Sequence, residues 1–189
     1  MSASRVPRDA PRRASRKASS VVIVNTGDGK GKSTAAFGTM LRAVARGWKV
    51  CVVQFVKSSD KWKVGEREVG TRLGVDWSAV GDGFSWDSKN LEKSAELARA
   101  GWRSAASKVA SGAYGLVILD EITYPVNWGW VPLADVLEAI RSRPADVNVI
   151  LTGRDAPQEL IDLAGTVTEM RNRKHAFDSG VQAIQGIDF

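Results

Sequence analysis

Short apolar runs alternate along the chain with longer stretches in which apolar residues recur at helical spacing. The short runs predict strands at residues 21–24, 49–55, 75–80, 116–119, 147–151 and 166–170. The longer stretches predict helices at residues 33–46, 90–111 and 157–163, and one that begins at Pro132. Strands that alternate with helices imply βαβ crossovers, so we expect an α/β fold with a mostly parallel sheet covered by helices on both faces. Ligands bind such sheets at the carboxyl ends of the strands.

Length and charge indicate one domain with a basic tail. A chain of 189 residues suits a single core. Residues 1–20 hold six basic residues and one acidic residue, which accounts for five of the six net positive charges. We therefore expect residues 1–20 to be a flexible basic tail or a lid that orders over a ligand, and residues 21–189 to form the domain. The nearly neutral domain makes nucleic acid an improbable partner.

Cysteine content and hydropathy point to a soluble cytoplasmic protein. Cys51 is the only cysteine, so neither an intrachain disulfide nor a cysteine zinc cluster can form. It lies in an apolar run and is expected to be a small core residue. No apolar stretch approaches the ~18 residues that a membrane-spanning helix needs.

A glycine-rich loop joins the first predicted strand to the first helix. It has the strand–loop–helix context of a P-loop, and its residues are Thr26, Gly27, Asp28, Gly29, Lys30, Gly31, Lys32, Ser33 and Thr34. Backbone N–H groups, the helix N-terminus and Lys32 would surround phosphate oxygens, and the Ser33 hydroxyl would ligate Mg²⁺. The usual pattern G-x-x-x-x-G-K-[ST] is incomplete because Thr26 stands where its first glycine would be. We predict a P-loop NTPase fold of RecA-like architecture that binds ATP.

An acidic pair follows the buried run at residues 116–119. Asp120 and Glu121 are placed as in a Walker B site, in which an aspartate holds the metal directly or through water. A strand that merely ends in solvated acids is the alternative for an isolated run. Together with the loop at Lys32, the pair predicts a nucleotide site in which Asp120 and Glu121 are metal ligands and Glu121 also contacts the nucleotide.

The fold alone does not choose among kinases, hydrolases, motors and other nucleotide enzymes. Six strings narrow the choice, and they occur in the order GDGKGKSTAAFG, VVQFVK, GFSW, LDEITYPV, ILTGR and KHAFDSGVQAIQGID. As an ordered set they resemble the P-loop branch of the ATP:corrinoid adenosyltransferases. The resemblance covers the chain from about Val21 to its end.

The resemblance implies an unusual use of ATP. The Co(I) form of cobalamin or of a precursor corrinoid attacks the 5′ carbon of ATP, which forms a cobalt–carbon bond and releases triphosphate. ATP is implied to lie in the reverse of the usual P-loop direction. The leaving triphosphate gains charge, and Lys30, Lys32, the loop amides and Mg²⁺ would stabilise it. An electron donor that reduces the corrinoid and a homodimeric assembly are implied as well.

The resemblance also implies roles for an aromatic pair. Phe84 and Trp86 match residues that pack against the lower face of the corrinoid and exclude its lower axial ligand. Their spacing of two places both on one side of an extended segment. The alternative is that both are core residues of a covering loop.

Other residues have open roles. Glu121 would polarise water in a hydrolase and hold metal or nucleotide in the transferase family. Arg154 is equally consistent with a phosphate contact and a surface ion pair. Arg171 and Lys174 could contact ATP or the corrinoid rim. For the single histidine, His175, and for Trp128 and Trp130, the sequence does not decide between structural and ligand-binding roles.

Competing functions are a P-loop ATPase acting on nucleic acid, a small-molecule kinase and a non-catalytic nucleotide-binding module. The basic tail and seven tryptophans favour the first, whereas the neutral body and single domain oppose it. Family members often carry a longer helical segment before the loop, so the short, Arg-rich residues 1–20 depart from the pattern. The sequence does not identify the natural corrinoid.

Overall fold

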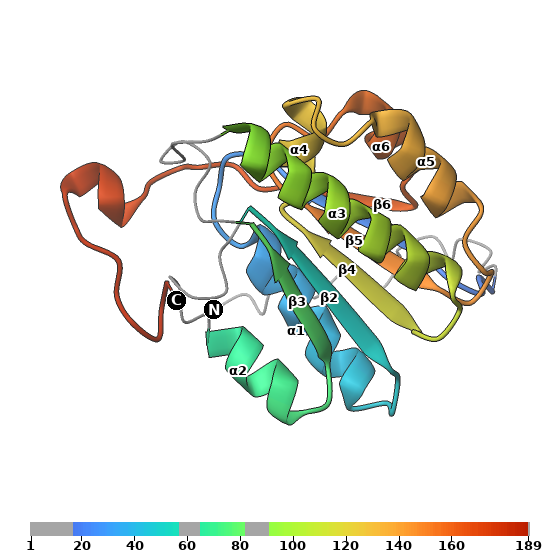
Figure 1. Ribbon diagram of the computed structural model, residues 1–189. Helices are drawn as coiled ribbons and strands as arrows, with labels where there is room; N and C mark the ends of the chain where they lie inside the picture. Colours follow the sequence, from blue (N-terminus) through green and yellow to red (C-terminus); the bar gives the residue numbers. More distant parts are fainter. Residues whose placement is uncertain (1–16, 57–64, 82–90, 189) are drawn as a thin grey trace, which may run out of the picture.

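The computed structural model describes residues 17–56, 65–81 and 91–188. Residues 1–16 of the expected tail or lid, and both Phe84 and Trp86, lie outside this described part. The described chain forms one sheet of six parallel strands, in the order β3-β2-β4-β5-β1-β6 (Figure 1). The strands are β1 (Val22–Thr26), β2 (Val50–Phe55), β3 (Asp76–Val80), β4 (Leu116–Asp120), β5 (Asn148–Thr152) and β6 (Thr166–Glu169). All six predicted strands are confirmed, with ends shifted by one or two residues.

Helices cover both faces of the sheet, as the sequence predicts. One face carries α1 (Lys32–Val44) and α2 (Gly65–Arg72), and the other carries α3 (Leu91–Ala110), α5 (Leu133–Arg141), α6 (Gln158–Leu163) and the short α4 (Thr123–Asn127) (Figure 1). The four predicted helices are α1, α3, α5 and α6. Pro132 is the N-cap of α5, where its lack of an N–H group costs nothing. The chain ends in an extended segment with one 3-10 turn, η2 (Ala176–Ser179).

Alternate residues of the central strands enter two separate cores. Cys51 and Val53 of β2 pack with Trp102 and Ala105 of α3, whereas Val52 packs with helix α1. Residues of β4 and β5 divide between the two cores in the same way. This arrangement explains why the strands read as continuous apolar runs. Cys51 is fully buried, as expected of a core residue, and burial raises the pKa of its thiol to about 11.

Left-handed backbone gathers at the carboxyl ends of the strands. Among the described residues other than glycine, only Val56, Glu121 and Asp155 have a positive φ, at 69°, 59° and 50°. Val56 directly follows β2, Glu121 directly follows β4, and Asp155 lies in the loop after β5. Each such conformation costs on the order of 1–3 kcal/mol and persists only where the surroundings hold it. The sheet therefore concentrates strained backbone at the edge where a ligand is expected.

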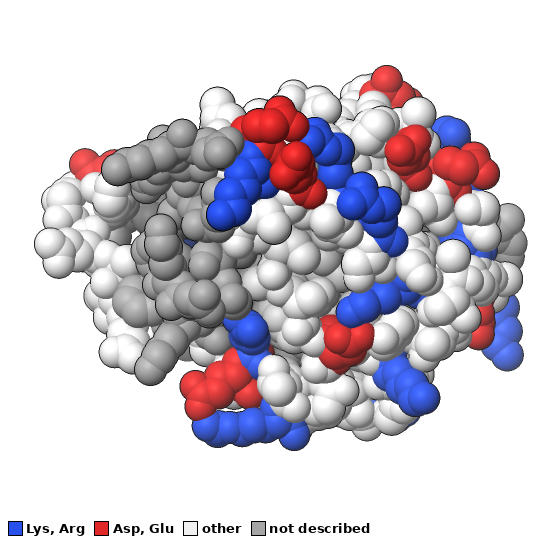
Figure 2. Space-filling view, viewed as in Figure 1, with Lys and Arg blue, Asp and Glu red and all other residues white. Residues whose placement is uncertain are grey.

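The described surface shows charges of both signs. On the face seen in Figure 2, Lys and Arg side chains are interspersed with Asp and Glu over α2, α3 and their neighbours. This distribution agrees with the nearly neutral composition of the domain. None of the described helices combines the length and the hydropathy that crossing a bilayer would require.

Candidate active site

The phosphate loop joins β1 to α1 at the carboxyl edge of the sheet. Gly31 caps α1 in a left-handed conformation at φ 108°, and Lys32 is the first residue of the helix. The first backbone hydrogen bond of the helix runs from the Ala35 N–H to the Gly31 carbonyl at 2.8 Å. The amides that precede Ala35 have no intrahelical acceptor, as at every helix N-terminus. The loop thus has the geometry of an anion-binding helix start.

Two loop glycines are required by the chain that follows β6. A Cβ atom on Gly27 would lie 2.5 Å from the Met170 carbonyl oxygen, and one on Gly29 would lie 2.8 Å from the Arg171 carbonyl carbon. The Gly29 N–H donates to the Met170 carbonyl at 2.6 Å, and the Met170 N–H donates to Thr26 at 2.8 Å. The chain after β6 therefore packs against the loop and bonds to its backbone. The sequence assigned these glycines to phosphate approach alone and missed this contact.

Thr26 replaces the usual first glycine without disrupting the loop. It is the last residue of β1 and is buried, so the position needs no left-handed conformation. Its hydroxyl accepts a hydrogen bond from the Ala156 N–H at 3.1 Å. This bond ties the loop to the connection between β5 and α6. Thr26 therefore holds the loop in place through its side chain, whereas a glycine at this position would add only backbone flexibility.

Lys32 lies within the loop at the centre of a group of charges. Its Nζ donates to the carbonyls of Gly27 and Gly29, both at 2.7 Å. Burial lowers the pKa of Lys32, and the charge of Arg154 lowers it further, while Glu121, Asp28 and Asp120 oppose this effect. The interactions show that the loop, the end of β4 and the loop after β5 converge here. Burial is the largest of these influences, and together with Arg154 it outweighs the three acids.

Asp120 is completely buried at the end of β4. Its two carboxylate oxygens accept hydrogen bonds from the Gln54 amide at 2.8 Å and the Thr152 hydroxyl at 2.7 Å. The Thr152 oxygen also accepts from the Glu121 N–H at 2.9 Å, which helps to hold Glu121 in its left-handed conformation. Sequence reasoning missed Gln54 and Thr152. A glutamine within the apolar run of β2 was the available signal.

The predicted metal ligands are hard oxygen donors. Mg²⁺ is usually bound through one or two carboxylates, waters and substrate phosphates, which the Ser33 hydroxyl and the carboxylates of Asp120 and Glu121 suit. A buried aspartate with two fixed hydrogen bonds is also an oriented carboxylate, suited to act through water. Within the described ranges, no group of three or more His, Cys, Asp or Glu residues is arranged to hold a metal ion by protein ligands alone. The residues therefore fit a metal shared with a phosphate chain.

Arg154 reaches the site from the loop after β5. The preceding Gly153 has φ 142°, and a Cβ atom there would lie 2.0 Å from the Thr123 hydroxyl oxygen. That hydroxyl donates to the Arg154 carbonyl at 2.6 Å. The Arg154 side chain is exposed, and it is the second cause of the lowered Lys32 pKa. Its guanidinium thus lies near the loop lysine, which brings two positive charges to one side of the site.

The aromatic residues after β4 form a packed row. The rings of Tyr124 and Trp128 have centroids 5.4 Å apart, and those of Trp128 and Trp130 are 4.7 Å apart. Burial raises the pKa of Tyr124, and Glu121 raises it further. Trp130 packs against the core, whereas Trp128 retains 37% exposure. The row therefore borders the acidic pair, and Tyr124 joins the site although the sequence did not single it out.

The C-terminal segment provides the remaining predicted residues. Arg171 is exposed and pairs with Glu169 at 3.2 Å. His175 has a structural role, since its Nδ1 accepts from the Phe177 N–H at 3.0 Å and caps η2. Lys30 of the phosphate loop forms an ion pair with Asp188. A pocket of about 690 Å³ lies between this segment and the loop, and its lining includes Lys30, Arg171, Lys174 and Asp188.

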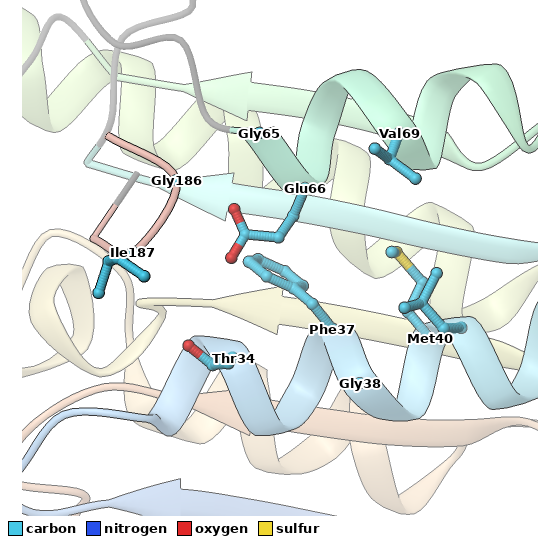
Figure 3. A pocket seen from close by; sticks show the side chains of 10 residues that line it. Thr34, Phe37, Gly38, Met40, Gly65, Glu66, Val69, Gly186 and Ile187 are labelled. Carbon is cyan, nitrogen blue, oxygen red and sulfur yellow. The ribbon is translucent and has the colours of Figure 1, made fainter. Parts of the chain in front are cut away.

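A second pocket of about 460 Å³ opens beside the loop, between α1 and α2. Figure 3 shows Phe37 and Met40 of α1 facing Glu66 and Val69 of α2, with Thr34 and Ile187 at one end. Its lining is mostly apolar except for Thr34 and Glu66. The site residues of the described part are thus brought together, from Thr26 to Thr34, at Asp120 and Glu121, and at Arg154 and Arg171.

The fold and the loop define a P-loop protein of the nucleoside-triphosphatase-like class. Residues 18–189 match the model of the family described as ATP:corrinoid adenosyltransferase BtuR/CobO/CobP. The chain is 45% identical over 169 residues to the corrinoid adenosyltransferase of Escherichia coli strain K12, which covers 89% of this chain and 85% of that protein. It is 44% identical to the enzyme CobA of Salmonella typhimurium over the same shares, and 40% identical to the Pseudomonas aeruginosa corrinoid adenosyltransferase, of which 83% is covered.

The chain belongs to the ATP:corrinoid adenosyltransferase family. It is therefore an enzyme of the class that transfers an alkyl group. The family resemblance read from the six strings is confirmed.

Proposed function

We propose that this protein transfers the 5′-deoxyadenosyl group of ATP to the Co(I) ion of cobalamin or of a precursor corrinoid. The Co(I) electron pair forms the cobalt–carbon bond while the bond between C5′ and its oxygen breaks. The electrons of the broken bond leave on the triphosphate, so that the corrinoid is oxidised formally to Co(III). The product would serve adenosylcobalamin biosynthesis or salvage.

The arrangement around Lys32 supports the proposal most directly. An ammonium group bound to two loop carbonyls, with Arg154 nearby, lies at the start of a helix whose first amides lack intrahelical partners. The lowered pKa of Lys32 indicates a positive charge that an anionic ligand would stabilise. A triphosphate chain has the charge and the length to bridge Lys32, Arg154 and Lys30.

The chain needs no nucleophile of its own in this reaction. The substrate cobalt supplies the electron pair, so the protein has to bind, orient and stabilise the leaving group. Prearranged donors in a partly buried site stabilise developing negative charge more than water does. We assign this role to Lys32, Lys30, Arg154 and the amides of residues 30–34, since the Gly29 N–H already donates to Met170. Arg171 would contact the outer end of the phosphate chain.

We propose that Mg²⁺ joins the site through the Ser33 hydroxyl, Glu121 and, through water, Asp120. When bound, it would neutralise part of the phosphate charge. The hydrogen bonds from Gln54 and Thr152 hold the Asp120 carboxylate in a fixed orientation for this purpose. Glu121 has a left-handed backbone conformation, and its charge acts on Lys32.

We assign Phe84 and Trp86 to the lower face of the corrinoid, on the basis of the family resemblance. If they exclude the lower axial ligand, their loss should matter chiefly when Co(II) must be reduced on the enzyme. The double variant Phe84→Ala/Trp86→Ala is expected to lose activity with Co(II) corrinoid and a reductant, yet retain most of it with corrinoid already reduced to Co(I). Equal losses with both substrates would instead indicate a packing role.

An electron donor that reduces the corrinoid and a homodimeric assembly complete the proposal, both by family resemblance. The assembly is tested by light scattering of the purified protein across a concentration series. A monomer at all concentrations that support activity would remove the dimer from the proposal without affecting the chemistry.

The proposed activity is tested by anaerobic incubation with chemically reduced cobalamin, ATP and Mg²⁺. The expected result is a light-sensitive adenosylcobalamin spectrum that Lys32→Ala abolishes. The matched control is Lys49→Ala, because Lys49 is an exposed lysine at the start of β2, at the opposite edge of the sheet. An unchanged corrinoid spectrum, with DNA-stimulated release of phosphate, would favour the nucleic-acid ATPase instead.

A further inference from the structure

We propose that the C-terminal turn at residues 184–188 occupies the phosphate loop from within the chain and is displaced by the phosphate chain of the nucleotide. The carboxylate of Asp188 forms an ion pair with Lys30, a lysine of the loop. This inference rests on the proposed function, because it concerns the same loop, and it adds a competition that sets the affinity for ATP.

The turn is preformed around Asp188. One carboxylate oxygen accepts from the Ile184 N–H at 2.8 Å, and the other pairs with Lys30. The backbone N–H groups of Ile187 and Asp188 both donate to the Ile184 carbonyl, at 3.1 and 2.8 Å. Gly186, at φ 85°, permits this tight turn. The chain therefore presents a fixed carboxylate to the loop.

The turn is held weakly enough to leave. Ile187 lines the pocket between α1 and α2, opposite Phe37 and Thr34, but its side chain retains 78% exposure (Figure 3). The apolar contact thus contributes little, and the ion pair is the main link. The Lys30 side chain is 53% exposed, so solvent and salt screen the pair. A phosphate chain with several negative charges can replace a single carboxylate at this lysine.

The surroundings favour the exchange. Arg171 and Lys174 share with Lys30 and Asp188 the pocket of about 690 Å³ between the C-terminal segment and the loop. When Asp188 leaves Lys30, that pocket loses its negative charge beside the loop and gains an unpaired cation. Because ATP binds the open state only, the closed fraction lowers its apparent affinity in proportion. An exposed pair corresponds to a factor of about 2–5 in affinity.

The exchange is tested by Asp188→Asn, which keeps the shape and an acceptor for the Ile184 N–H. The matched control is Asp178→Asn, which removes the same charge from η2 in the same segment. Titration calorimetry with inorganic tripolyphosphate and with ATP should show about 2–5-fold tighter binding for Asp188→Asn than for Asp178→Asn. In the Lys30→Gln background, Asp188→Asn should have no further effect. Equal affinities of the wild type and both single variants would overturn the proposed competition between Asp188 and the phosphate chain.

Hydrogen exchange gives a second readout that does not depend on turnover. Saturating tripolyphosphate should speed exchange of the Ile187 and Asp188 amides in the wild type, and Asp188→Asn should speed it without ligand. Slower exchange on ligand binding would contradict displacement of the turn, because it would mean that the turn closes over the bound ligand. If the wild type adenosylates corrinoid but exchange at residues 184–188 does not change with ligand, the displacement of the turn is wrong and the proposed function stands. If the wild type binds neither tripolyphosphate nor ATP, both the displacement of the turn and the proposed nucleotide site are wrong.

Discussion

Two lysines in this protein have opposite electrostatic surroundings. Lys108 of α3 donates to Asp76 of β3 at 2.8 Å, and the Tyr114 hydroxyl donates to the same carboxylate. Burial is the largest single influence and lowers the pKa of Lys108, but the bond to Asp76 and the charges of Asp76, Cys51 and Tyr114 together outweigh it, so the pKa is raised. Lys32 is bound to carbonyls, lies near Arg154, and has a lowered pKa. Within the described ranges, Lys32 forms no ion pair with a carboxylate.

We call Lys108, Asp76 and Tyr114 the closed cluster, and Lys32 with its surroundings the open cluster. At Lys108 the charges are balanced inside the chain, so the cluster joins β3 to α3 and needs no ligand. At Lys32, burial and Arg154 outweigh the nearby acids Asp28, Asp120 and Glu121, and the balance is left to a ligand. We expect substitutions at the open cluster to affect function and those at the closed cluster to affect stability.

The largest effect is expected at the open cluster. Lys32→Ala should lower adenosyl transfer by on the order of 10²–10³-fold, because it removes a donor aimed at the leaving triphosphate. The melting temperature should change little, since the ammonium bonds only loop carbonyls. Steady-state assay and thermal unfolding of the same preparation check this. If Lys32→Ala loses stability and activity together, Lys32 has a structural role like that of Lys108.

The next effect is a pH dependence at the same lysine. Because the pKa of Lys32 lies below that of an ordinary lysine, its charge is lost earlier as pH rises. Binding of tripolyphosphate should therefore weaken at alkaline pH before other lysines titrate, and Lys32→Arg should shift that weakening to higher pH. Calorimetric titrations between pH 7 and 10 measure it. Identical pH profiles for the two proteins would contradict the lowered pKa.

A smaller effect is expected at the closed cluster. Hydrogen bonds from Lys108 and Tyr114 lower the pKa of Asp76, so its contribution to stability is present above the unfolded pKa and is lost as pH falls through the folded one. Asp76→Asn should cost about 0.5–1 kcal/mol at pH 7, since solvent screens the partly exposed pair. Denaturant titrations should show this difference shrinking at acidic pH, with adenosyl transfer unchanged. A loss that persists unchanged below pH 3 would exclude the charge as its cause.

The smallest effect is expected from Tyr114→Phe, which removes one hydrogen bond to Asp76. We expect a cost of roughly 0.5 kcal/mol at pH 7, and less in the Asp76→Asn background, because the two residues share one interaction. A double-mutant cycle from denaturant titrations measures the coupling. Strict additivity would show that the cluster is not one unit.

The sequence predicts the sheet well because buried strands read as continuous apolar runs, but it misses two helices. Helix α2 buries only Gly70, so it has no apolar face to reveal it. Helix α4 is five residues long and contains Pro125. Both owe their form to neighbours in the fold rather than to a periodic pattern.

For the site, the local motifs are predictable and the contacts between them are not. The loop and the acidic pair follow from spacing. The support of Gly27 and Gly29 by Met170, the bonds of Gln54 and Thr152 to Asp120, and the pair of Lys30 with Asp188 join residues far apart in sequence. Only the folded chain brings these together. Phe84 and Trp86 keep the role that the resemblance implies, as a prediction for the Co(II) experiment.

The phosphorus product of a single turnover tests the central claim most directly. Enzyme in excess over ATP is mixed anaerobically with Co(I) corrinoid and Mg²⁺, and the products are resolved by ³¹P NMR. We predict one tripolyphosphate for each adenosylcorrinoid formed, because the open cluster around Lys32 stabilises an intact triphosphate as it leaves. ADP with inorganic phosphate and an unaltered corrinoid would contradict it, and would mean that the loop serves hydrolysis or phosphoryl transfer.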